Sequence, residues 1–228
     1  MRVGVVSYPG ACDDRDAMHA VSLVGAEPVR LWHADPDLGG VDAVIIPGGF
    51  SYGDYLRPGA LAALSPVMQG VRAHAAAGRP VLGICNGFQV LAEARLVPGV
   101  LRPNASLKFR CHDVAMTVEH ESPWLPGCDA GDELTIPMKH HDGCWFADPE
   151  QVAALEASGQ ILLRYREDPN GSVGRVACVT NEAGNVAALM PHPEHAVEEL
   201  IGSTDGRILL QGLFDIAERA ASPAHSSA

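Results

Sequence analysis

The chain has 228 residues, of which 47% are hydrophobic and 19% charged, and its formal net charge is −12 at pH 7. This composition is typical of a globular protein with a sizeable core, and it excludes disordered, collagen-like and coiled-coil chains. The acid excess argues against a nucleic acid partner, and the apolar runs are too short for a signal peptide or a membrane span. We therefore expect a soluble, cytoplasmic protein.

The cysteines of the chain form no C-x-x-C pair. They are Cys12, Cys85, Cys111, Cys128, Cys144 and Cys178. This spacing indicates neither a zinc finger nor a disulfide scaffold, so we expect reduced thiols and no metal site. The position of each cysteine in the fold then decides whether it is reactive.

The first half of the chain alternates short apolar runs with helical patterns, as in α/β proteins whose parallel sheet is covered on both faces. The apolar runs predict strands at Arg2–Ser7, Val29–Trp32, Ala43–Pro47 and Val81–Ile84. Helices are predicted from a cap at Asp13 through Leu23, and over Val67–Ala77 behind a Ser65 cap and Pro66.

The second half changes to short strands separated by turns, a pattern that indicates antiparallel pairing. The predicted strands are Val114–Val118, Leu134–Met138, Ile161–Tyr165, Val176–Thr180 and Val186–Met190. Residues 181–185 predict a hairpin loop, and Asp205 caps a last helix that ends near Ala221. The sequence thus predicts one α/β domain over residues 1–221, and a disordered tail over 222–228. Its fold is a flavodoxin-like, mostly parallel sheet with helices on both faces and a small antiparallel extension.

The segment Gly83-Ile84-Cys85-Asn86-Gly87 joins the fourth predicted strand to a helix. Glycines two residues before and after the cysteine are typical of a sharp strand-to-helix elbow, where backbones approach too closely for a Cβ. The helix N-terminus favours the thiolate form of Cys85. This pattern indicates a nucleophile rather than a packing cysteine.

A thiolate that attacks a carbonyl needs hydrogen-bond donors for the developing oxyanion. The backbone N–H of Asn86 is one candidate, and the Gly48-Gly49 turn after the third strand offers another if the two strands are neighbours. Taken alone, the two glycines equally suit an ordinary tight turn.

The segment Pro191-His192-Pro193-Glu194 is stiff, because each proline fixes its own φ and restricts the residue before it. Residues two apart in extended chain point the same way, so Glu194 can orient the ring of His192. Together with Cys85 these residues form a Cys-His-Glu arrangement for acyl transfer.

At these residues the chain resembles the triad-type, class I glutamine amidotransferases and, within them, the glutaminase subunits of phosphoribosylformylglycinamidine synthase. The resemblance covers nearly the whole chain and is most specific in the Phe-Ser-Tyr-Gly-Asp loop at 50–54 and in Asn86. It implies a glutaminase with Cys85 as nucleophile, His192 as base and Glu194 as its partner. It also implies that Gly49 and Asn86 are the oxyanion donors and that Gln89 helps to hold glutamine.

The resemblance further implies that ammonia passes to a larger, ATP-dependent synthetase subunit of purine biosynthesis, in an assembly with a small third subunit. The chain has no P-loop, so no cofactor is expected on it, and ATP with magnesium is expected on the partner. The mixture of aromatic and charged residues beside the oxyanion turn suits a partner-facing loop, and residue type alone suits an ordered surface loop equally well. Its residues are Phe50, Ser51, Tyr52, Asp54 and Arg57.

Two segments depart from the family pattern. His140-His141-Asp142-Gly143-Cys144 replaces the usual His-Gly-Glu-Gly-Arg, and His195 replaces an Arg. The first segment also resembles a metal ligand set, but neighbours on a strand point to opposite faces and do not converge on one ion.

Two other functions remain open on sequence alone. One is a thiol hydrolase or peptidase of a related elbow-bearing α/β family, although Asn86 occupies the place where such enzymes commonly carry their base. The other is a non-enzymatic redox sensor with an exposed thiol, which leaves His192 and Glu194 without a role.

Overall fold

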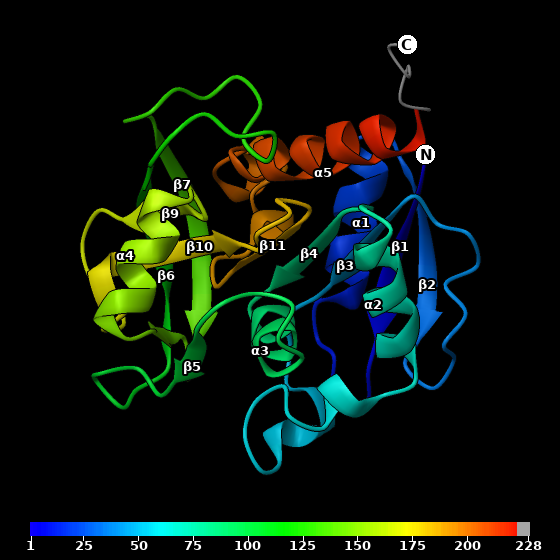
Figure 1. The fold of residues 1–228 in the computed structure, drawn as a ribbon, viewed down its shortest axis with the longest axis horizontal. Coiled ribbons are helices and arrows are strands. Elements are labelled where there is room, and N and C mark those ends of the chain that lie inside the picture. The colour runs from blue at the N-terminus through cyan, green and yellow to red at the C-terminus, as the bar shows by residue number, and fades with distance from the viewer. Residues whose placement is uncertain (223–228) are drawn as a thin grey trace.

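A nine-stranded sheet forms the centre of the protein in the computed structural model, which describes residues 1–222 (Figure 1). The order of the strands across the sheet is β2-β1-β3-β4-β11-β10-β9-β6-β7. The predicted tail lies outside the described residues, except for Ser222.

The first five strands in this order run parallel to one another. They are β2 (Glu27–Trp32), β1 (Arg2–Ser7), β3 (Ala43–Ile46), β4 (Val81–Ile84) and β11 (Val186–Leu189). Strands β1, β3, β4 and β11 are almost wholly buried, which explains why their sequences are continuous apolar runs. We call this part, with its helices, the parallel half.

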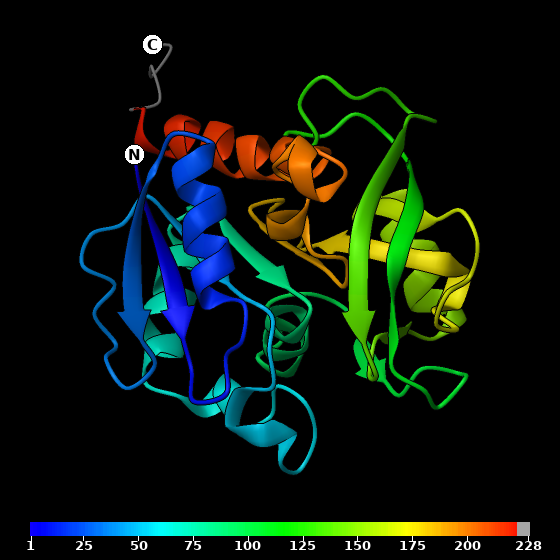
Figure 2. The same cartoon turned by 180° about the vertical axis from the view of Figure 1, so that it is seen from behind.

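Helices cover both faces of the parallel half. They are α1 (Asp14–Leu23), α2 (Val67–Ala76), α3 (Asn86–Glu93) and α5 (Gly206–Ala221). Helix α2 lies in front of the strands in Figure 1, and α1 lies in front of them in the opposite view of Figure 2. The mostly parallel α/β fold predicted from the sequence is confirmed.

The remaining four strands continue the sheet with antiparallel pairing. They are β10 (Val176–Thr180), β9 (Ile161–Tyr165), β6 (Arg110–Val118) and β7 (Glu133–His140). Helix α4 (Pro149–Ala157) lies on these strands, and β5 (Val100–Arg102) pairs with β8 (Cys144–Phe146) in a separate two-stranded sheet (Figure 1). We call this part the antiparallel half.

The sequence analysis missed three of these elements because each is short and carries little periodic signal. Strands β5 and β8 have three residues each, and helix α4 buries only Leu155. The start of α4 did carry a signal, because Pro149 follows Asp148, whose side chain accepts a hydrogen bond from the Gln151 N–H.

The prediction that the side chains of Asp13, Ser65 and Asp205 cap helices is wrong. The carboxylate of Asp13 binds Lys139, that of Asp205 accepts from the Thr135 N–H, and the hydroxyl of Ser65 bonds to Tyr52. None of these side chains caps its helix, and α2 has Pro66 in the cap position. Each polar side chain makes a tertiary hydrogen bond in place of a local one.

The described chain also contains five short 3-10 turns. They are η1 (Ser51–Asp54), η2 (Ala62–Leu64), η3 (Val173–Arg175), η4 (Pro193–His195) and η5 (Glu199–Ile201). Among residues 1–222, no helix combines the length and the apolar composition needed to cross a bilayer.

The segments after β1, β3, β4 and β11 leave the sheet at one edge, because these strands are parallel. That edge is where ligands bind in open α/β sheets. It brings together Asp13, the Gly48-Gly49 turn, Cys85 and His192 from four distant parts of the sequence.

Candidate active site

Cys85 lies at the elbow between β4 and α3, with φ 50° and ψ −104°. A positive φ is costly for a residue with a Cβ and is typical of a strained nucleophile elbow. A Cβ on Gly87 would overlap the carbonyl oxygen of Ile46, and one on Gly83 would lie 2.9 Å from the carbonyl carbon of Gly87. Gly83 and Gly87 therefore allow the close approach of backbone segments that the sequence analysis predicted.

Two backbone N–H groups next to Cys85 are free. Within residues 1–222, neither the Asn86 N–H nor the Gly49 N–H donates a hydrogen bond. Asn86 begins helix α3, so its N–H adds to the positive end of the helix dipole. Gly49 has φ 144° and lies against the backbone of Ala11 and Cys12, where a Cβ would collide. Both donors thus stand ready for an anion.

His192 and Glu194 form a buried pair. The ring Nδ1 of His192 lies 2.6 Å from Oε1 of Glu194, and both side chains are at most 1% exposed. Burial by itself lowers the pKa of His192, but the charge and hydrogen bond of Glu194 and the charge of Cys85 outweigh it and raise that pKa. The ring therefore favours the imidazolium form.

Cys85 and His192 line the same small cavity, of about 130 Å³. Its wall is formed by Cys12, Asp13, Gly49, Phe50, Asp54, Cys85, Gln89, Phe109, Lys139, His140, His141, Asp142 and His192. A water occupies about 30 Å³ of liquid, so the cavity suits a small solute. The buried Nε2 of His192 has no hydrogen-bond partner in the described chain. The Cys85 Sγ lies 3.6 Å from the Lys139 carbonyl oxygen.

Gln89 also lines the cavity, but its amide is bound within the protein. Its Oε1 accepts from Asn86 Nδ2 at 2.8 Å, and its Nε2 donates to the Asp142 carbonyl at 2.7 Å. Gln89 therefore fixes a wall of the cavity. The substrate contact predicted for it would have to use the second N–H of Nε2 or the remaining lone pair of Oε1.

Asp54 and Asp142 place two carboxylates on the cavity wall. Burial, together with the nearby charge of Asp142, raises the pKa of Asp54 to about 6. Asp54 Oδ1 lies 3.5 Å from Asn86 Nδ2, and Asp142 Oδ2 lies 2.8 Å from His141 Nδ1. The two acids favour a ligand that brings a positive charge.

The segment that carries Asp142 is held by buried amides. Asn104 Nδ2 donates to the His140 carbonyl and its Oδ1 accepts from the Gly143 N–H, while Asn170 Nδ2 donates to the Gly143 carbonyl. His140 is buried and His141 exposed, so these neighbours do point to opposite sides. Burial and the charge of His192 lower the pKa of His140 to about 3, so its ring is neutral.

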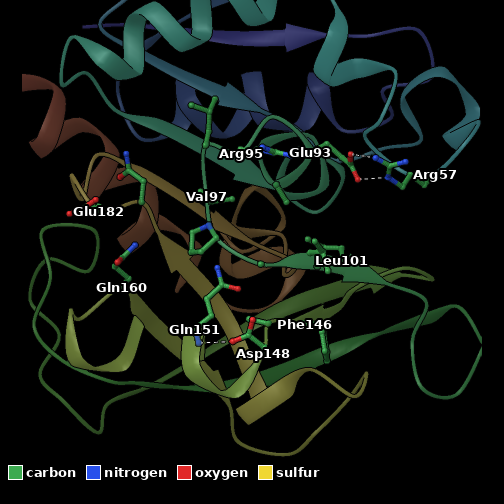
Figure 3. Close-up of a pocket in the computed structure, with 17 residues that line it drawn as sticks. Arg57, Glu93, Arg95, Val97, Leu101, Phe146, Asp148, Gln151, Gln160 and Glu182 are labelled. Atoms are coloured by element: carbon green, nitrogen blue, oxygen red, sulfur yellow. Dashed lines mark hydrogen bonds and ion pairs between the residues drawn. The ribbon is translucent and has the colours of Figure 1, made fainter. Parts of the chain in front are cut away.

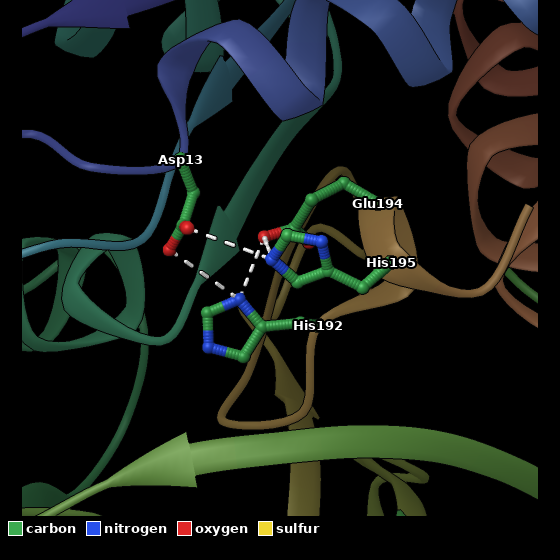
Figure 4. A group of neighbouring side chains, drawn as sticks. All are labelled: Asp13, His192, Glu194 and His195. Carbon is green, nitrogen blue, oxygen red and sulfur yellow. Dashed lines mark hydrogen bonds and ion pairs between the residues drawn. The ribbon is translucent and has the colours of Figure 1, made fainter. Parts of the chain in front are cut away.

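Asp13 and His195 join His192 and Glu194 in a four-residue cluster (Figure 4). Their ligand atoms lie within 4.8 Å of one another, as in a metal site. However, the 2.6 Å separation of His192 Nδ1 and Glu194 Oε1 is a hydrogen-bond length, and the ammonium of Lys139 already lies 2.6 Å from Asp13. A proton and a lysine supply the positive charge here.

The predicted partner-facing loop is only partly exposed. Phe50 and Arg57 are exposed, and Arg57 binds Glu93 through two hydrogen bonds. Ser51 is buried, and its N–H donates to Asn86 Oδ1, so its assignment to a partner-facing surface is wrong. The Tyr52 hydroxyl lies 2.6 Å from His33 Nδ1. Through these contacts, Ser51 and Tyr52 attach the loop to the rest of the protein.

A larger hollow, of about 980 Å³, lies between α3, β5 and α4 (Figure 3). Arg57, Glu93 and Phe146 are among its lining residues, which include no cysteine and no histidine. It therefore lacks a thiol and an imidazole, so the smaller cavity is the candidate site for acyl transfer.

Sequence analysis missed the roles of Asp13 and Lys139 and treated His195 only as a departure from a pattern. Asp13 follows β1, so its place after the carboxyl end of a parallel strand was a usable signal. Lys139 lies on β7 in the antiparallel half, and nothing in the sequence predicts that this strand crosses the site.

The chain is similar to several known proteins. A family model described as the CobB/CobQ-like glutamine amidotransferase domain matches residues 1–207. A protein of Rubrobacter xylanophilus named phosphoribosylformylglycinamidine synthase subunit PurQ is 56% identical over 215 residues, which cover 94% of this chain and 98% of the relative. The Leifsonia xyli protein of the same name is 53% identical over 95% of this chain and 94% of its own length.

A solved structure has the same fold and a related sequence. A chain of the structure titled PurLQS from Thermotoga maritima superposes with a TM-score of 0.86 at 43% identity. The match covers 94% of this chain and 97% of that one.

Proposed function

Because the chain belongs to the CobB/CobQ-like glutamine amidotransferase family and, within it, to the PurQ subunits of phosphoribosylformylglycinamidine synthase, we propose that it hydrolyses glutamine with a Cys85-His192-Glu194 triad. One observation carries this proposal. The sulfur at a strained elbow and a buried, unpartnered imidazole nitrogen line a single small cavity.

In the first half of the reaction, the Cys85 thiolate adds to the carboxamide carbon of glutamine. The carbonyl oxygen becomes an oxyanion, which accepts hydrogen bonds from the Gly49 and Asn86 N–H groups. The His192 imidazolium gives its proton to the amide nitrogen, the C–N bond breaks, and ammonia leaves. A glutamyl thioester and a neutral His192 remain.

In the second half, neutral His192 takes a proton from water, and the resulting hydroxide attacks the thioester carbonyl. The same N–H groups hold the second oxyanion. Its collapse breaks the C–S bond, releases glutamate and restores the thiolate beside an imidazolium. Glu194 holds the ring in one tautomer throughout, as its 2.6 Å contact with Nδ1 supports.

The two acids on the cavity wall orient the substrate in this proposal. Glutamine carries an α-ammonium group, and Asp54 with Asp142 supplies two carboxylates on the wall that also carries Cys85. An ammonium between them relieves their mutual repulsion. Glutamine then enters with its side-chain amide toward the sulfur.

The chain is the amidotransferase component of an ATP-dependent ligase complex with a synthetase subunit. We propose that its ammonia passes directly to that subunit for the synthesis of phosphoribosylformylglycinamidine, in an assembly that includes a small third subunit. ATP and magnesium act on the synthetase. The exposed residue Phe50, on the cavity wall, and the exposed Arg57, farther along the same loop, belong to the proposed docking surface. All six cysteines are free thiols, which supports a cytoplasmic enzyme.

The test is Cys85→Ala in the complex with the synthetase. Glutamine-dependent amidine formation should fall by about 10³-fold or more, because the nucleophile is lost. Synthesis from added ammonium should continue at the wild-type rate, because the synthetase site is untouched. Cys111→Ala, at an exposed position on β6, is the matched control and should keep both activities.

Two results would contradict the proposal. One is a Cys85→Ala complex that still uses glutamine, which would assign the nucleophile elsewhere. The other is wild-type protein that cleaves peptides or esters but releases no ammonia from glutamine, which would favour a thiol hydrolase.

A further inference from the structure

We propose that Asp13 is a second carboxylate partner of the His192 ring and a positioning residue for it, an inference that rests on the proposed function. Glu194 approaches the ring from within the same turn, η4, whereas Asp13 reaches it from the start of α1 (Figure 4). The two carboxylates hold one imidazole from two separate elements of the fold.

The contacts of Asp13 converge on the catalytic edge of the sheet. Its Oδ2 lies 3.6 Å from His192 Nδ1, and its Oδ1 lies 3.5 Å from His195 Nε2. Lys139 Nζ donates to Oδ1 at 2.6 Å. A Cβ on Gly48 would collide with both Asp13 Oδ2 and the His192 ring. The absence of that side chain is what allows the carboxylate and the ring to meet.

Asp13 is an anion in this environment. Its side chain is 4% exposed, and burial alone would raise its pKa. The nearby ring of His195, the hydrogen bond from Lys139 and the charge of His192 outweigh that cost and hold the pKa well below its usual range. Attraction between two charges is reciprocal, so Asp13 also favours the imidazolium form of His192.

The ion pair between Asp13 and Lys139 connects the two halves of the molecule. Lys139 lies on β7, and its carbonyl oxygen lies 3.6 Å from the Cys85 sulfur. By holding the ammonium, Asp13 fixes the strand whose backbone faces the nucleophile. One carboxylate thus positions the ring directly and the surroundings of the sulfur indirectly.

The charge of the ring depends on groups from four elements. Glu194 and His195 face it from η4, Asp13 from the start of α1, Cys85 from the elbow, and Lys139 with His140 from β7. Removing the Asp13 anion must lower the pKa of His192. The imidazolium would then be lost at a lower pH as the pH rises.

The test is Asp13→Asn, which keeps the shape of the side chain and removes its charge. NMR of the His192 ring in the full chain should show its titration about one pH unit lower. In the complex with the synthetase, kcat for glutamine should fall about tenfold, with KM nearly unchanged and the alkaline limb at lower pH. Asp16→Asn, an exposed position in the first turn of the same helix, is the matched control for charge and should change neither.

Lys139→Met separates a direct role from an indirect one. Removing the ammonium should raise the pKa of His192, in the direction opposite to Asp13→Asn, because a cation is lost and Asp13 is freed for the ring. Equal shifts in the same direction, or a wild-type ring titration and kcat in Asp13→Asn, would overturn the proposal. Should Asp13→Asn fail to fold, an unchanged titration in Lys139→Met overturns it.

The ring titration requires no turnover, so it tests the contact between Asp13 and His192 by itself. If Cys85→Ala in the complex still uses glutamine, the proposed function fails, whatever the titration shows. If Cys85→Ala behaves as expected and Asp13→Asn titrates like wild type, only the role of Asp13 fails.

Discussion

The two halves of the molecule contribute to the site in different ways. The parallel half supplies the proposed reacting groups through its backbone, because the elbow, the Gly48-Gly49 turn and the Pro191–Glu194 segment all follow carboxyl ends of parallel strands. The antiparallel half supplies one wall of the cavity through β7 and residues 140–142, held by buried side-chain amides. In the proposed reaction, the chemical steps depend on the backbone geometry of the parallel half. Substrate binding depends on the hydrogen-bonded wall formed by β7 and residues 140–142, which we call the cover.

This division has a physical cause. A strained elbow needs a rigid, fully buried strand behind it, and the central parallel strands provide one. The cover must instead fit the polar substrate of the proposed reaction. Polar side chains at the end of a strand can be substituted without changing the strand pairing of the sheet. Changes at the backbone turns of the parallel half should reduce kcat, whereas changes at the side chains of the cavity wall, such as Asp54, and in the antiparallel half should raise KM.

The sharpest way to break the parallel half is Gly87→Ala. The new Cβ would overlap the Ile46 carbonyl oxygen, so the elbow must shift and move the sulfur away from the oxyanion donors. A displacement of about 1 Å at a reacting group costs about 100-fold in rate. Steady-state kinetics with glutamine should therefore show kcat lower by about that factor.

Gly212→Ala is the matched control for this prediction. Its Cβ would overlap the Trp124 carbonyl oxygen, a similar collision on α5, away from the cavity. Both variants should lose about 1–3 kcal/mol of unfolding free energy through overpacking. Only Gly87→Ala should lose kcat. Equal losses of kcat in both would mean that general destabilisation, not the elbow, controls the rate.

Asp54→Asn tests the cavity wall, with a smaller expected effect. If Asp54 holds the ammonium of glutamine, KM should rise about tenfold while kcat stays near wild type, because a charge-assisted hydrogen bond is lost. In wild-type protein KM should rise as the pH falls through about 6, since protonation removes the same charge. That rise should be absent in the variant.

Glu199→Gln removes an exposed carboxylate outside the cavity and serves as the control for net charge. It should keep the wild-type KM and the wild-type pH dependence. A wild-type KM in Asp54→Asn at all pH values would show that the ammonium is held elsewhere.

Sequence reasoning predicted the parallel half better than the antiparallel half. The elbow and the His-Pro-Glu segment are local patterns, because a short run of residues must satisfy the turn by itself. Gly83, Gly87 and Gly49 could be assigned for the same reason, since a glycine at a close backbone approach has no substitute.

The rest of the site depends on contacts between segments far apart in the sequence. Asp13 and Lys139 are separated by 126 residues, and either one alone is an ordinary polar residue. Asp13 was predicted as a helix cap because the local pattern fits one, and the fold uses its carboxylate elsewhere. The missed strands β5 and β8 likewise derive their pairing from each other, over about 45 residues, and not from their own three-residue patterns.

Asn170→Ala tests the contribution of the cover to substrate binding, and its expected effect on KM is the smallest of these variants. Asn170 is buried, donates to the Gly143 carbonyl, and accepts from the N–H and hydroxyl of Ser172. Its loss leaves the Ser172 N–H unpaired and leaves the Gly143 carbonyl with only the Ser172 hydroxyl at 3.5 Å, so chemical denaturation should show a loss of about 2 kcal/mol of unfolding free energy. The loosened segment carries Asp142, so KM for glutamine should rise a few-fold while kcat remains near wild type.

Asn181→Ala is the matched control. It removes comparable hydrogen bonds in the β10–β11 hairpin, and should cost similar stability without changing KM. An unchanged KM in Asn170→Ala would mean that the cover is held by Asn104 and Gln89 alone, and a fall in kcat would mean that the cover also aligns the reacting groups.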